Sequence, residues 1–255
     1  MLRRITPALA AVALLLAACG GSGPAIEDPR EIVAQGLAAT SELTTVHLVL
    51  ALDGTADVPQ LGGSELTLDG TTVEGDVDLA DSEAHLSFTA MGFTGELIQA
   101  GGDSYLKTPL TGPSWVKSTA AAGDPVSEVT DPAAMLQGVR DFLDDESVEV
   151  EKLSDTDCGD GRCYAVRLTV PASAMAGAGD VAGVDPAELV GDGLVLDLLF
   201  DRDDLWLAGV STQVDAQSVG SLTLRLTLSD FNADVSVDVP SPDEVTEGGG
   251  SLFGF

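Results

Sequence analysis

Residues that could hydrolyse a substrate are few in this sequence. A serine hydrolase holds its nucleophile on a sharp strand-to-helix turn, usually marked by a G-x-S-x-G motif. The nearest match, Gly112-Pro113-Ser114-Trp115-Val116, lacks the last glycine. The two histidines, His47 and His85, each fall on the polar side of an alternating segment, which is typical of surface histidines rather than of a general base or a metal ligand. The sequence therefore predicts no catalytic residue and no enzyme activity.

Two acidic turns are the candidates for a metal site. The segment Asp155-Thr156-Asp157-Cys158-Gly159-Asp160-Gly161 is similar to a calcium loop, but Gly159 stands where an EF-hand has an oxygen ligand. Asp201-Arg202-Asp203-Asp204 is more typical of a hairpin turn, because Asp side chains accept hydrogen bonds from nearby N–H groups. We expect no metal and no cofactor.

The first 18 residues have the pattern of an export signal. Arg3 and Arg4 precede an apolar run from Ile5 to Ala18, which is shorter than the ~20 residues of a membrane-spanning helix. Leu16-Ala17-Ala18-Cys19 resembles the lipobox of bacterial lipoproteins. In that family the cysteine thiol takes a diacylglyceryl group, and cleavage before it makes the cysteine the new N-terminus.

The lipobox resemblance implies that Cys19 carries lipid, palmitate among its acyl chains. It also implies that the mature chain is exported and anchored to the outer face of the cytoplasmic membrane. The alternative is an ordinary signal peptide that happens to contain a cysteine.

Cys158 and Cys163 form a pair once Cys19 is assigned to lipid. An even pair in an oxidising compartment, separated by the glycine-rich Gly159-Asp160-Gly161-Arg162, predicts a structural disulfide in a hairpin. The C-x4-C spacing differs from the C-x-x-C of redox enzymes, and two thiols alone make a poor zinc site.

The charge of the chain disfavours two kinds of partner. Against 42 Asp and Glu stand 11 Lys and Arg, giving a net charge of −31. Such a surface repels nucleic acid and anionic lipid headgroups. A solvated surface is sufficient to explain the charge, so we infer no partner from it.

Segments whose apolar residues have the spacing of a helix alternate along the chain with segments that have the two-residue spacing of a strand. Asp-Pro pairs at Asp28-Pro29, Asp131-Pro132 and Asp185-Pro186 each predict the start of a short helix. Period-two alternation predicts roughly ten half-buried antiparallel strands. The expected strands are Val46–Leu52, Val73–Leu79, Ala84–Ala90, short segments around Leu97, Tyr105 and Trp115, and then Ser147–Leu153, Cys163–Val170, Leu194–Phe200, Leu205–Val214, Leu222–Leu228 and Val235–Val239.

The expected fold is α+β, with one large curved antiparallel sheet and short helices on its apolar face. Hydrophobic residues make up 44% of the chain but aromatics only 4%, so an aliphatic lining leaves room for a cavity between helices and sheet. A fully packed core is the alternative. The predicted cavity walls are Leu48, Leu50, Val77, Leu86, Phe88, Leu224 and Leu226, with Met135, Val139 and Leu143 as the roof.

Short structural motifs support a family resemblance over nearly all of the mature chain. They are Thr72-Val73-Glu74-Gly75-Asp76-Val77, Tyr105-Leu106 followed by Trp115, Asp131-Pro132 with its helix, and Leu228-Ser229-Asp230-Phe231-Asn232 leading to Pro240. With the lipobox, this order resembles the LppX/LprA/LprF/LprG lipoproteins of mycobacteria and related actinobacteria. The resemblance implies a half-barrel similar to that of the lipoprotein carrier LolA. It also implies binding of an acylated lipid or glycolipid and its movement across the cell envelope.

The predicted organisation is a signal peptide at 1–18, a lipidated flexible tether at 19–27, a lipid-binding half-barrel at 28–240 and a C-terminal tail at 241–255, which is expected to be disordered after Pro240 until Leu252. Expected partners are a lipid or glycolipid, the membrane through Cys19, and a transporter, with the protein itself a monomer. The alternative function is a structural or regulatory lipoprotein with a filled core that acts through protein partners.

Overall fold

The alternating segments form one large curved sheet. The computed structural model describes residues 25–58, 64–119, 132–159, 161–175, 190, 193–216 and 220–247. Within these ranges the sheet has 14 strands rather than roughly ten. The expected helix at Asp185-Pro186 and the lipobox cysteine Cys19 lie outside the described residues.

The strands are β1 Thr45–Val58, β2 Ser64–Thr67, β3 Thr71–Asp78, β4 Glu83–Ala90, β5 Phe93–Ala100, β6 Asp103–Lys107, β7 Trp115–Thr119, β8 Glu149–Lys152, β9 Thr156–Cys158, β10 Gly161–Pro171, β11 Gly193–Asp201, β12 Leu207–Ala216, β13 Gly220–Ser229 and β14 Val245–Glu247. The helices are α1 Pro29–Thr40, α3 Pro132–Asp144 and α4 Ala172–Met175.

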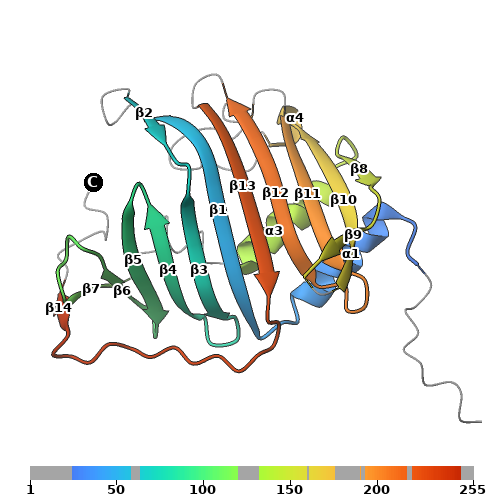
Figure 1. Ribbon diagram of the computed structural model, residues 1–255. Coiled ribbons are helices and arrows are strands. Elements are labelled where there is room, and N and C mark those ends of the chain that lie inside the picture. Colours follow the sequence, from blue (N-terminus) through green and yellow to red (C-terminus); the bar gives the residue numbers. More distant parts are fainter. Residues whose placement is uncertain are drawn as a thin grey trace, which may run out of the picture.

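The sheet order is β14-β7-β6-β5-β4-β3-β1-β13-β12-β11-β10-β8. Most neighbouring strands in this order are consecutive in the sequence. One exception is β1, which lies between β3 and β13 and so joins the first half of the sheet to the second (Figure 1). The pairings are antiparallel except between β14 and β7, which run parallel. The sheet is therefore mixed rather than purely antiparallel.

The end of the chain differs from expectation. Val235–Val239 is extended but pairs with no strand among the described residues. This part of the chain runs past the ends of β1, β3, β4 and β5 to reach β14 (Figure 1). Val237 contacts a cluster of Ile98, Ala100, Tyr105 and Trp115. The apolar alternation of this segment therefore comes from packing against the sheet and not from backbone hydrogen bonds to a neighbouring strand. The disorder expected after Pro240 is wrong for Val245–Glu247, which joins the sheet.

The helices lie on one face of the sheet (Figure 1). As predicted, α1 begins with Asp28 as its N-cap, whose side chain accepts a hydrogen bond from the Arg30 N–H, and Pro29 occupies the first helical turn. The side chains of Ile32, Val33 and Leu37 are fully buried against the sheet. Within the described residues, no helix is long and apolar enough to cross a membrane.

Two arginines tie α1 to its neighbours. The Arg30 guanidinium donates to the carbonyl oxygens of Leu143 and Val148, both at 2.6 Å, and Arg140 donates to the Leu37 carbonyl at 2.9 Å. The carbonyls in the last turn of a helix have accepting capacity to spare, and these bonds use it near the end of each helix, beside the Ser41 N–H bond to the Leu37 carbonyl in α1. The position of α3 relative to α1 and β8 is therefore set by specific polar contacts as well as by packing.

Candidate functional site

The strand pairing gathers the predicted cavity walls on one side of the sheet. Leu226 of β13 is opposite Leu50 of β1, Leu50 is opposite Val73 of β3, and Val73 is opposite Phe88 of β4. Side chains at paired positions project from the same face. These four residues therefore form an apolar row across four strands, about 14 Å long at the usual strand spacing.

A second row lies beside the first. It passes from Leu228 through Leu48, Gly75 and Leu86 to Leu97. Val77 and Leu224 extend the same face on either side, since Val77 pairs with Val46 and Leu224 with Leu52. We call this side of the sheet, which also carries α1 and α3, the helix face. All seven predicted wall residues lie on it.

The predicted roof lies over a different part of the helix face. Val139 and Leu143 of α3 pack on the main core cluster, built around α1, β10 and β11. Val77 and Leu86 belong to a second cluster with Val46 and Ala84, and Leu228 contacts both clusters. The Met135 side chain lies outside the described residues.

The two halves of the helix face are therefore covered differently. The principal contacts of α1 and α4 with the sheet fall on β8, β10, β11 and β12, within the part of the chain that the structure describes. Leu168, Leu198 and Phe200 beneath them are less than 2% exposed. On β1 and β13, by contrast, Leu50 and Leu226 are only half-buried. The row from Leu226 to Phe88 is therefore less fully covered than the apolar surface beneath α1.

Sequence reasoning left out two members of this face. Val73 and Leu97 contact the second cluster and belong to the two rows. The Val73 alternation was visible in the sequence. Only the pairing of β3 with β1 and of β5 with β4 shows that these residues join the same surface.

The opposite side of the sheet carries charge, and we call it the charged face. His47 lies 2.7 Å from Asp76 (Nδ1 to Oδ1), and His85 lies 3.6 Å from Glu96. Arg167 donates two hydrogen bonds to Asp197, at 2.6 and 2.7 Å, and these bonds raise the pKa of Arg167 above its usual value. Both histidines occupy the polar side, as predicted.

A hollow of about 510 Å³ lies on the charged face, between β3 to β6 and the segment after β6. It is lined by Thr72, Glu74, Ser87, Phe88, Thr89, Thr94, Gly95, Glu96, Lys107, Thr108, Pro109 and Gly112. Hydroxyls and charged groups dominate this lining. The hollow therefore suits an acyl chain far less well than the aliphatic rows of the helix face do.

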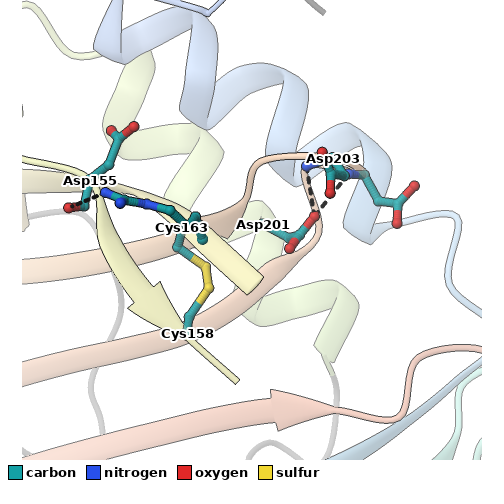
Figure 2. The surroundings of a disulfide bond; sticks show 7 residues. Asp155, Cys158, Cys163, Asp201 and Asp203 are labelled. Carbon is teal, nitrogen blue, oxygen red and sulfur yellow. Dashed lines mark hydrogen bonds between the residues drawn. A yellow bond between two sulfur atoms is a disulfide. The ribbon is translucent and has the colours of Figure 1, made fainter. Parts of the chain in front are cut away.

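The predicted disulfide joins Cys158 of β9 to Cys163 of β10, with their Cα atoms 5.8 Å apart (Figure 2). The carboxylate of Asp155, a candidate calcium ligand, instead forms an ion pair with Arg202 (Oδ2 to Nη1, 3.1 Å). In the other acidic turn, Asp201 accepts hydrogen bonds from the N–H groups of Asp203 and Asp204, as a hairpin turn requires. The contacts of this region therefore connect β9 to β10 and close the acidic turn.

Comparisons with known proteins identify the fold. No protein-family model matches the chain, and no curated protein does. The lipoprotein LppX of Mycobacterium tuberculosis is 19% identical, with a TM-score of 0.54 over 83% of this chain and 100% of its own. LprF from Mycobacterium bovis is 15% identical, with a TM-score of 0.56 over 84% of this chain and 97% of its own. The chain has the LppX-like half-barrel fold predicted from its sequence.

Proposed function

We propose that this protein is an exported, lipid-anchored carrier that holds an acylated lipid or glycolipid on its helix face and moves it across the cell envelope. In this proposal residues 1–18 are removed, Cys19 is lipidated, and 19–27 tether the domain that follows. The observation that carries the proposal is the apolar row of Leu226, Leu50, Val73 and Phe88, which lies away from the buried core beneath α1.

The chemistry of this row matches an acyl chain. Its side chains are aliphatic or aromatic and offer no hydrogen-bond donor or acceptor, so they favour a ligand that needs none. Each methylene removed from water contributes about 0.8 kcal/mol. A long acyl chain therefore gains enough from burial along such rows to bind without any ionic contact. No covalent step is part of this function.

The charged face supports the same assignment by exclusion. Its His47–Asp76 and Arg167–Asp197 pairs keep that side hydrated. The helix face carries the two apolar rows, and burying acyl chains against charged pairs on the other face would cost desolvation energy. An acylated ligand on the helix face would be shielded from water on one side by the sheet.

A second candidate function is a structural or regulatory lipoprotein whose helix face is filled by its own side chains. The burial of Val77 and Leu86, which are 7% and 4% exposed, favours this reading for the part of the face near β3 and β4. Such a protein would act through protein partners and would bind no lipid in its core.

Substitutions at two adjacent residues of β13 distinguish the two candidate functions. Leu226 is half-buried on the helix face, whereas Thr227 is exposed on the charged face. We expect Leu226→Glu to weaken the binding of a fluorescent fatty acid to delipidated protein at least tenfold, about 1.4 kcal/mol. Thr227→Glu adds the same charge on the other side and should leave the affinity within about twofold. Equal affinity in both variants, with both still folded, would exclude the helix face as the lipid site.

A further inference from the structure

Three large apolar side chains are exposed at one end of the sheet. Met91 is 55% exposed, Phe93 53% and Leu110 86%. Single exposed apolar residues are ordinary on protein surfaces. Met91 and Leu110 lie in neighbouring connections and Phe93 is the first residue of β5, and we call the three the apolar tips.

The topology places the apolar tips together. Met91 lies in the turn between β4 and β5, and Leu110 lies in the segment between β6 and β7. Because β4 to β7 are successive antiparallel strands, both connections fall at the same end of the sheet (Figure 1). The same hollow lies beside both connections, since it is lined by Thr89 and Thr94, which lie on either side of the first connection, and by Pro109 and Gly112 of the second.

The backbone at Met91 is unfavourable for methionine. Met91 and Gly92 have φ angles of 52° and 79°, so both central residues of this two-residue hairpin are left-handed. That geometry favours Asn-Gly, because a bulky side chain is disfavoured at positive φ. A methionine that is both strained and exposed at a hairpin tip points to a role for its side chain in contact with something outside the chain.

The tips lie in uncharged stretches of a strongly acidic protein. Residues 87–95 and 108–116 contain no Asp, Glu, Lys or Arg, although the chain has a net charge of −31. Two of its three lysines, Lys107 and Lys117, flank the second stretch. Lys117 pairs with Asp103 at 2.9 Å, whereas Lys107 has no ion pair with another described residue and lies 5.3 Å from the centre of the Trp115 ring.

We propose that the apolar tips insert into the interfacial layer of a lipid bilayer. Exposed apolar side chains enter the headgroup boundary, and a lysine next to them can reach the interface with its charged end while its stem lies along apolar surface. Narrow hairpin tips expose too little area for a stable protein interface, which buries about 800 Å² on each partner. The acidic charge of the whole chain favours a zwitterionic surface over an anionic one.

The contact is tested with a fluorescent probe at Leu110. The mature chain, reconstituted in phosphatidylcholine vesicles, carries Leu110→Cys labelled with an environment-sensitive fluorophore. The control is Asp81→Cys, in the exposed turn between β3 and β4 at the other end of the strands. The native pair Cys158–Cys163 is oxidised and does not take the label, and the unsubstituted chain measures any label on Cys19.

Lipids with a quencher on their acyl chains should quench the probe at residue 110 several times more strongly than the probe at residue 81. Phosphatidylglycerol vesicles at low salt should reduce the difference. Adding Met91→Asn should raise the melting temperature and also lower the quenching at residue 110, which a purely structural methionine would not do.

Equal quenching at the two positions would overturn the proposal. So would a blue shift at residue 110 that rises with protein concentration in the absence of vesicles, because that would show a second copy covering the tips. The Leu226→Glu substitution should leave the quenching unchanged. Membrane contact and lipid binding on the helix face can therefore fail separately.

Discussion

The ring of Phe200 lies directly against the backbone of Gly36, so that β11 and α1 meet without an intervening side chain. A Cβ atom at Gly36 would collide with three atoms of that ring. Phe200 is fully buried, and the close approach holds α1 on the covered half of the helix face. Glycine is needed in the middle of this helix because of packing.

Gly36→Ala should therefore destabilise the fold by about 1–3 kcal/mol, the usual cost of overpacking a core. Gly138 in α3 is the matched control, because a Cβ there would meet nothing within 4 Å. Gly138→Ala should stabilise the protein by about 0.5–1 kcal/mol through helix propensity. Thermal or urea unfolding measures both, and a destabilising effect of equal size at both positions would contradict the packing argument.

The disulfide should be dispensable for folding. Cys158 and Cys163 close a loop with a sequence separation of 5, for which loop-closure entropy gives about 2 kcal/mol. In a domain of this size, the double substitution to Ser should lower the melting temperature by roughly 4–8 °C. Fatty-acid affinity should not change. A double variant that does not fold at all would show that the pair does more than staple β9 to β10.

Anchoring should depend on Cys19. One acyl chain binds a bilayer only marginally, whereas two or three hold a protein stably, at ~0.8 kcal/mol per buried methylene. Cys19→Ala should abolish incorporation of radiolabelled palmitate and leave the protein uncleaved or released from membranes. A variant that is cleaved normally and still acylated would refute the lipobox assignment.

The placement of α3 changes what a substitution at Val139 would do. In a cavity roof, a tryptophan would occupy ligand space at little cost. Val139 instead packs on the main core cluster, so Val139→Trp should destabilise the protein by about 1–3 kcal/mol. Its effect on lipid affinity should be smaller than that of Leu226→Glu. Titrating a fluorescent fatty acid into both variants, alongside their melting curves, checks this order.

Local patterns predicted most of these elements. The Asp28-Pro29 start of α1, the Asp201 turn and the alternation of Leu224 and Leu226 all follow from contacts within a few residues. Pairings between segments far apart in the sequence could not be predicted from such local patterns. No local signal places β14 parallel to β7, or packs Val139 on the main core cluster rather than on the cluster of Val77 and Leu86, because those arrangements depend on how distant segments meet.

The same limit applies to the candidate site. Alternation assigned Leu50, Phe88 and Leu226 to apolar sides of their own strands, and only the registers of β1 with β13 and β3 show that these sides coincide. The apolar tips were also missed, since an exposed Met91 or Leu110 looks like any other apolar residue until its accessibility is known.

Native mass spectrometry of the protein purified from its own host tests the central claim most directly. A non-covalent acylated lipid should add its mass in the native spectrum and be lost on denaturation, whereas lipid on Cys19 remains in both. The same non-covalent mass should disappear in Leu226→Glu and persist in Thr227→Glu. A parent protein whose native and denatured masses agree, with no lipid bound at any stage of purification, would contradict the proposal that the helix face carries lipid.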